Sequence, residues 1–180
     1  MLSMYHRMHC KLLLAFLLST IIFSGCKKEG TPTSVAQSTV TDADLLTLVQ
    51  STTTTTYYRH SLKILPHSSG SGHSDFPFLR TRYNTIAATQ LDINGQVKKD
   101  AIFPDSSLII KELFNADTTI GRFALLFKST RALNADANGW VWAEIATSGT
   151  VAYSVSNKGA GCIGCHSAGI NFTRMNDSFP

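Results

Sequence analysis

The most informative feature of this sequence is the pentapeptide Cys162-Ile163-Gly164-Cys165-His166. Its two thiols are three positions apart, so both can reach the vinyl groups on one edge of a haem. The imidazole of the next residue then lies under the iron as an axial ligand. The spacing therefore predicts one covalently attached haem c, held by Cys162, Cys165 and His166.

Three other uses of the two cysteines leave the histidine unexplained. A redox-active CxxC pair is expected in a βαβ context at a helix N-terminus, whereas a glycine-rich segment precedes Cys162 here. A structural disulfide would suit an exported protein. Zinc would need further ligands, and the chain after residue 25 offers His60, His67 and His73. His67 and His73 flank a loop rich in Ser and Gly, and we expect both to be exposed to solvent.

Residues 1–25 have the pattern of a bacterial export signal. Arg7 and Lys11 precede the apolar run 12–23, which is shorter than the roughly 20 residues that span a bilayer. Small residues lead directly into Cys26, as in a lipobox, where the cysteine is lipidated and the preceding residues are removed. The alternative is an ordinary signal peptide that leaves Cys26 as a spare thiol.

A polar segment, residues 26–41, follows the predicted lipidation site and is expected to be a flexible tether. We expect an exported lipoprotein on the periplasmic side of a bacterial membrane. Lys27 follows Cys26 in place of the aspartate that often retains lipoproteins at the inner membrane, which favours the outer one. Loss of residues 1–25 leaves 14 basic against 12 acidic residues, a balance that gives no electrostatic reason to expect nucleic-acid binding.

The remaining residues, 42–180, are predicted to form one mainly β (α+β) domain, an antiparallel sheet with few short helices. Thr41 is a candidate N-cap for a helix ending near Gln50. Gly and Asn/Asp turns separate runs with strand composition. The expected strands are residues 57–65, the start of 76–89, 107–114, 122–130, 140–147 and 150–155, with a loop at 66–75 and a turn at 92–95.

A sixth ligand to the iron is not evident from the sequence. Met175 is the only methionine after the leader and lies nine residues beyond His166, too near to reach the opposite haem face easily, so we expect it to serve in packing. Residues 134–139 begin like a calcium-binding loop, but position 12 of that loop would be Ile145. We interpret this segment as a turn. The iron is therefore expected to be five-coordinate and open to a small ligand.

Several further motifs resemble the cytochrome P-460 family and the related β-type cytochromes c′. These are Tyr58-Arg59, the segment 103–113 (FPDSSLIIKEL, with Ser106 in place of the usual glycine), Gly139-Trp140, and Phe172-Thr173-Arg174 after the pentapeptide. The resemblance covers most of the domain. It implies an antiparallel β-sheet fold, commonly dimeric, around one haem with an open distal side.

Lys111 occupies the position at which hydroxylamine-oxidising members of the family bond a lysine to the porphyrin ring. It alternates with Ile109 and Leu113, so its side chain should leave the strand on an apolar face. A lysine there is costly to bury as a cation and tends to become nucleophilic. The alternative is that Lys111 reaches solvent or pairs with a carboxylate.

One departure from the family leaves the function open. Catalytic relatives place an acid over the haem from the segment before the pentapeptide, whereas residues 145–161 contain none; Glu144 or a more distant acid would have to substitute. Lys111 favours an oxidoreductase acting on hydroxylamine or nitric oxide. The missing acid favours a protein that binds nitric oxide or another gas, whose distal pocket could be capped by aromatic residues such as Phe103, Phe114, Phe123 or Phe127. Simple electron transfer to an unidentified redox partner is disfavoured, because an axial methionine is lacking.

Overall fold

The computed structural model describes residues 37–67 and 72–179. The predicted signal peptide 1–25 and the lipidation site Cys26 lie outside the described residues, as does most of the tether. Among the helices that are described, none has the length and apolar character needed to cross a membrane.

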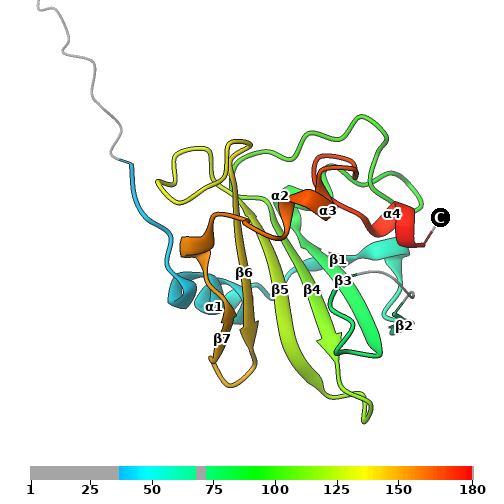
Figure 1. The fold of residues 1–180 in the computed structure, drawn as a ribbon. Helices are drawn as coiled ribbons and strands as arrows, with labels where there is room; N and C mark the ends of the chain where they lie inside the picture. Colours follow the sequence, from blue (N-terminus) through cyan, green and yellow to red (C-terminus); the bar gives the residue numbers. More distant parts are fainter. Residues whose placement is uncertain (1–36, 68–71, 180) are drawn as a thin grey trace, which may run out of the picture. The chain divides into compact units, whose positions relative to one another are not determined.

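The described residues form a seven-stranded antiparallel sheet, which confirms the predicted mainly β fold (Figure 1). Its strand order is β1-β3-β4-β5-β6-β7, and the short β2 also pairs with β3. The strands are β1 Thr55–Tyr57, β2 Leu65–Pro66, β3 Phe78–Asn84, β4 Leu108–Phe114, β5 Ile120–Lys128, β6 Trp140–Ala146 and β7 Val151–Tyr153.

The helices are short and few, as expected. The first, α1, spans Asp42–Ser51 and begins with a capping box, in which Thr41 and Asp44 bond to each other's backbone N–H groups. The predicted N-cap is therefore confirmed. The others are α2 Thr85–Ala88, α3 Ile163–His166 and α4 Met175–Ser178, with 3-10 turns η1 Tyr58–His60 and η2 Val155–Asn157.

The predicted strand 57–65 is wrong in its middle. Arg59 and His60 both have positive φ angles, 53° and 52°, so the chain turns through η1 instead of continuing as a strand. The backbone N–H of Arg59 donates to the carbonyl of Gly95 at 2.8 Å, and this long-range contact holds the turn. The predicted turn at 92–95 is present, closed by the bond from Gly95 N–H to Asp92 O at 3.0 Å.

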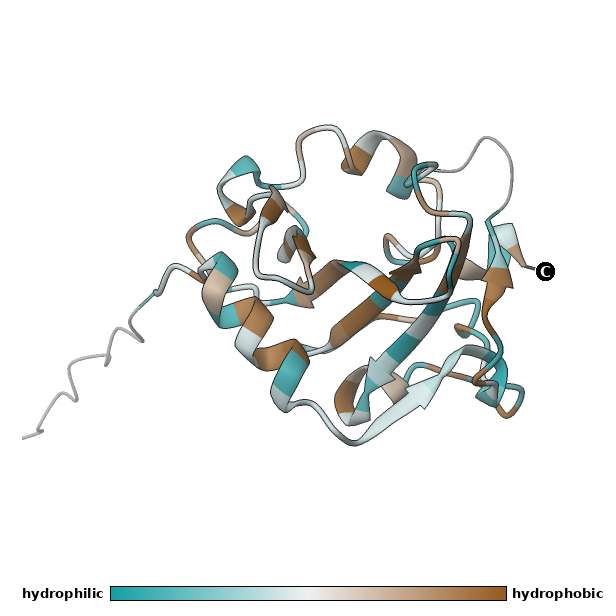
Figure 2. Cartoon of the chain, turned by 90° about the horizontal axis from the view of Figure 1, so that it is seen from below, coloured by the Kyte–Doolittle hydropathy of each residue, from teal (hydrophilic) through white to brown (hydrophobic). Residues whose placement is uncertain are grey.

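The two faces of the sheet bury different sets of residues. One face packs against α1, where Leu45 and Val49 meet Leu108, Ile110 and other strand residues. The other face packs against the connections and the C-terminal segment that carries α3 and α4. Apolar residues run along the strands and along α1 in Figure 2. Alternation along β4 therefore sends neighbouring side chains into two separate cores.

A buried ion-pair group lies on the α1 side of the sheet. Glu112 accepts from Arg80 Nε at 2.6 Å and from Arg82 Nε at 2.9 Å. The guanidinium of Arg82 also donates to the carbonyl of Thr52 at the end of α1. The Glu112 carboxylate is thus paired on the α1 side of the sheet. Lys111, the preceding residue in β4, points to the opposite side.

Candidate functional site

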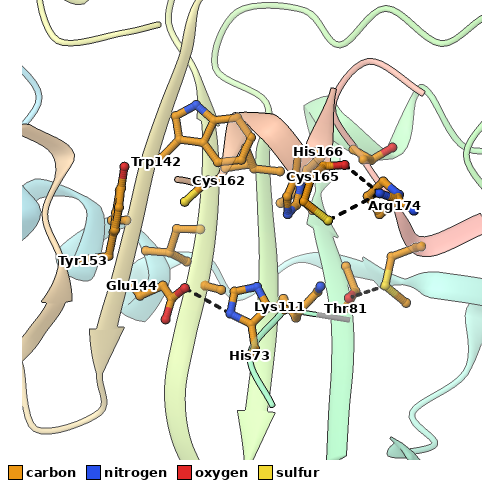
Figure 3. A pocket seen from close by; sticks show the side chains of 18 of the residues that line it. His73, Thr81, Lys111, Trp142, Glu144, Tyr153, Cys162, Cys165, His166 and Arg174 are labelled. Atoms are coloured by element: carbon orange, nitrogen blue, oxygen red, sulfur yellow. Dashed lines mark hydrogen bonds and ion pairs between the residues drawn. The ribbon is translucent and has the colours of Figure 1, made fainter. Parts of the chain in front are cut away.

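A cavity of about 700 Å³ lies on the face of the sheet that carries Ile109 and Lys111, a volume typical of cofactor and small-molecule sites. All four residues that the sequence predicts at the haem site line it: Cys162, Cys165, His166 and Lys111. Figure 3 shows these side chains around a common space. Strands β3 to β7 contribute one wall, and the segments 160–166 and 173–178 contribute the other.

One row of paired residues across the sheet supplies four polar side chains of this cavity. The antiparallel register places Thr81 opposite Lys111, Lys111 opposite Ala124, Ala124 opposite Glu144, and Glu144 opposite Tyr153. All five residues line the cavity. Lys111 and Glu144 are therefore separated by two strand spacings, or about 10 Å.

Lys111 faces the cavity, as its alternation with Ile109 and Leu113 predicts. It is the one residue of β4 that is not fully buried, and its remaining exposure is toward the cavity. It forms no ion pair or hydrogen bond with the described residues. Burial lowers the pKa of its ammonium group, and the charge of Glu144 only partly opposes this shift. The amine is thus easier to deprotonate than an ordinary lysine.

Glu144 supplies an acid that the segment before the pentapeptide lacks. Its Oε1 lies 3.0 Å from Nδ1 of His73, and its Oε2 lies 3.0 Å from Nη1 of Arg122. Burial would raise the pKa of this carboxyl, but the hydrogen bonds and charges of His73 and Arg122 outweigh burial and lower it. Glu144 therefore remains ionised at neutral pH inside the cavity.

The expectation that His67 and His73 are exposed to solvent is wrong. The His73 side chain is only 16% exposed, and it lines the cavity while contacting Glu144. His67 is half-buried, and its Nε2 lies 2.7 Å from the carbonyl of Gly72. The contact with Glu144 holds His73 against the sheet. The sequence around His73 does not indicate this contact.

The backbone around His166 orients its ring for ligation. Nδ1 lies 2.8 Å from the carbonyl oxygen of Phe172, so an Nδ1–H donor leaves the lone pair on Nε2. Metal-bound histidines are commonly held in this way. Asn171 and Phe172 both have positive φ angles, 44° and 69°, and this turn aims the carbonyl at the ring. Burial lowers the pKa of His166 to about 4, so the imidazole is neutral at pH 7.

Trp142 and Asp136 position His166 from the sheet side, and the sequence alone did not identify either residue. The Trp142 ring lies edge-on to His166, with centroids 5.1 Å apart at 86°. Its Nε1–H donates to Asp136 Oδ2 at 2.9 Å. Asp136 Oδ1 accepts from the backbone N–H groups of Asn138 and Trp140. Residues 134–139 thus form the predicted turn, and Asp136 of this turn also accepts the hydrogen bond from the Trp142 indole.

The two cysteines are free thiols in the structure. Burial raises the pKa of Cys162, although a hydrogen bond with the Tyr153 hydroxyl opposes that shift. Cys165 is exposed, and Arg174 Nη1 lies 2.6 Å from its carbonyl oxygen and 3.4 Å from its sulfur. Among the residues that the structure describes, no three His, Cys, Asp or Glu side chains are grouped to hold a metal ion.

Met175 is buried, as expected of a packing residue, and it also lines the cavity. It is 4% exposed, and its sulfur accepts a hydrogen bond from Thr81 Oγ1 at 3.1 Å. None of the four aromatic residues considered as a distal cap lines the cavity. Phe103 and Phe114 belong to the core on the cavity side, and Phe123 and Phe127 pack on the α1 side.

No family model matches this chain, and no curated protein matches it. The assignment of function therefore depends on the motifs of the chain and on the cavity.

Proposed function

We propose that this protein is an exported, lipid-anchored, mono-haem c-type cytochrome similar to cytochrome P-460, acting on hydroxylamine or nitric oxide. One observation carries the proposal: Cys162, Cys165 and His166 of the pentapeptide, Lys111 of β4 and Glu144 of β6 line a single cavity. Chance placement of the pentapeptide would not bring an unpaired lysine and an ionised carboxylate to the same space.

The residues present fit a haem c. Cys162 and Cys165 would form the two thioether bonds, and Nε2 of His166 would be the axial ligand. The cavity volume of about 700 Å³ suits a group of that size. When bound, the haem would supply an iron that exchanges single electrons and can bind a small ligand.

The roles of the other side chains follow from their charge and position. The unpaired amine of Lys111 is the nucleophile available for a bond to the porphyrin edge; this bond would replace a porphyrin hydrogen, with release of two protons and transfer of two electrons to an external oxidant such as a peroxide. The carboxylate of Glu144 is a proton acceptor inside the cavity, as oxidation of an N–O substrate requires. His73 contacts that carboxylate and is partly exposed, so it offers a way for the proton to leave.

A second function, non-catalytic binding of nitric oxide or another gas, is favoured by one observation. Both oxygens of Glu144 are already engaged, one by His73 and one by Arg122. A carboxylate held in two ion pairs is a weaker base than a free one. Simple electron transfer is less favoured, since the Met175 sulfur is hydrogen-bonded to Thr81.

Mass spectrometry of the digested holoprotein tests the proposal. We expect a Lys111 peptide joined to the haem peptide that contains Cys162 and Cys165, together with a red-shifted ferrous Soret band. Lys111→Ala should abolish the cross-link and keep the haem, whereas His166→Ala should lose the axial ligand. Release of nitrite or nitrous oxide from hydroxylamine would show turnover.

Two experimental results would contradict the proposed function. If the wild-type protein has no cross-link but binds nitric oxide tightly, the gas-binding function replaces the first. If the matured protein is colourless and free of porphyrin, both haem functions are wrong. Labelling with a radioactive fatty acid, with Cys26→Ser as control, tests the anchor separately.

A further inference from the structure

Tyr83 lines the cavity, and its buried hydroxyl group has no hydrogen-bond partner in the described part of the chain. Three buried side-chain polar atoms lack a hydrogen bond in the described part of the chain: Tyr83 Oη, Ser107 Oγ and Trp140 Nε1. Only Tyr83 among these three residues lines the cavity. Buried polar groups in folded proteins nearly always have a partner, so this hydroxyl group needs an acceptor that the described residues do not supply.

The position of Tyr83 gives its hydroxyl group little freedom to find another partner. The residue is completely buried, and its ring lies parallel to that of Phe103, with centroids 6.5 Å apart. Its neighbours across the sheet on the cavity side are Ile109 and then Leu126, which offer no side-chain acceptor. Burial also raises the pKa of Tyr83, so the group remains an O–H donor.

The same row of the sheet relates Tyr83 to the haem-binding end of the cavity. Tyr83, Ile109, Leu126 and Trp142 are paired in register from β3 to β6. Trp142 contacts His166, so Tyr83 is three strand spacings, or about 14 Å, from the strand next to the axial ligand. The thioether bonds lie on one side of a haem c and the two propionates on the other, and only the propionates are acceptors on its periphery.

We propose that the Tyr83 hydroxyl group donates a hydrogen bond to a propionate carboxylate of the bound haem. This inference rests on the proposed function, because it requires a haem in the cavity. It assigns to Tyr83 the role of a binding residue for the cofactor, separate from the thioethers and from His166. A hydrogen bond to a carboxylate withdraws negative charge from the porphyrin and so favours the reduced iron.

Tyr83→Phe in the holoprotein tests this role, because the change removes one oxygen and keeps the ring. We expect the propionate-bending band in resonance Raman spectra to shift and the midpoint potential to fall. Ser107→Ala is the matched control: it removes a buried, unpartnered hydroxyl group that does not line the cavity, and it should change neither quantity.

The outcomes separate the two proposals. If Tyr83→Phe binds haem with an unchanged propionate band and potential, the hydroxyl group contacts no more than a water molecule, and this inference is wrong while the proposed function stands. If the same shifts occur in Ser107→Ala, they reflect general loosening of the core and also count against it. A wild-type protein without porphyrin would overturn both proposals together.

Discussion

Asp136 and Trp142 are joined by a hydrogen bond of 2.9 Å between a carboxylate oxygen and the indole N–H. The bonded indole is the one that lies edge-on to His166, 5.1 Å away. Gly159 also packs closely against the Trp142 indole, since a Cβ at position 159 would lie 2.7 Å from its Nε1. The orientation of His166 therefore depends on a turn about thirty residues earlier in the chain, which contains Asp136.

Replacement of Asp136 by Ala should weaken both the turn and the ring contact. The change leaves the indole N–H without its acceptor and removes two bonds to backbone N–H groups. We expect a loss of about 1–3 kcal/mol in the free energy of unfolding, measured by chemical denaturation. The aromatic circular dichroism of Trp142 should also decrease.

Two variants serve as controls for this prediction. Asp136→Asn keeps an acceptor oxygen and should recover much of the stability. Asp117→Ala removes an exposed aspartate that bonds within its own turn, and it should leave the aromatic signal unchanged. Equal effects of the Asp117 and Asp136 substitutions would refute a specific role for Asp136.

Gly169→Ala should disrupt the turn that aims the Phe172 carbonyl at His166. A Cβ at this position would overlap the carbonyl oxygen of Thr173 and lie 2.7 Å from its carbonyl carbon. The backbone would have to move, at a cost of roughly 1–3 kcal/mol. Gly164→Ala is the matched control, because a Cβ there meets nothing within 4 Å. Thermal unfolding of the two variants should differ clearly, and similar melting temperatures would contradict the predicted clash.

Glu144→Gln should make stability less dependent on acid pH. The pKa of Glu144 is lowered from its ordinary value of 4.5, so its ion pairs stabilise the fold fully above pH 4.5. That contribution is lost as the pH falls below this value. We expect the variant to be about 1–3 kcal/mol less stable than wild type at pH 7, with a smaller difference at pH 3 to 4. A difference that stays constant with pH would show that the ionised carboxylate is not responsible.

On the proposed function, Met175→Leu should leave the coordination of the haem iron unchanged. The Met175 sulfur is hydrogen-bonded to Thr81 in the core, and a swap of similar volume costs less than about 1.5 kcal/mol. Near-infrared absorption of the ferric holoprotein reports methionine ligation directly. Loss of a methionine-to-iron band in the variant would prove that Met175 is a ligand and that the iron is not open.

Alternation along a strand allowed the sequence to predict which residues share one face of the sheet. Lys111 is an example, since Ile109 and Leu113 on either side place it on an apolar face. The same reasoning along 140–147 could have placed Glu144 beside Trp142 in the cavity, because the two residues are two positions apart on one strand. Glu144 was instead named only as a possible substitute acid, without a position in the fold.

The contacts from loops could not be predicted in this way. His73 and Glu144 are in contact although they are more than seventy positions apart in the sequence. Asp136, in a loop, accepts a hydrogen bond from the indole N–H of Trp142, which lies on β6. Such contacts depend on how the connections fold over the sheet, and loop composition alone carries no periodicity from which to infer it. The turn at Arg59 and His60 was missed for the same reason, since Gly95 holds it from a distant loop.

The ion pairs of Glu112 with Arg80 and Arg82 have a consequence for the opposite side of the sheet. A one-residue slip between β3 and β4 would separate these charges and also point Lys111 away from the cavity. The ion pairs of Glu112 therefore disfavour a misaligned pairing of β3 and β4, in which the Lys111 amine would not face the cavity. A variant that lacks Glu112 is expected to fold into a mixture of alignments, in which part of the population carries Lys111 on the opposite face of the sheet although none of it is unfolded.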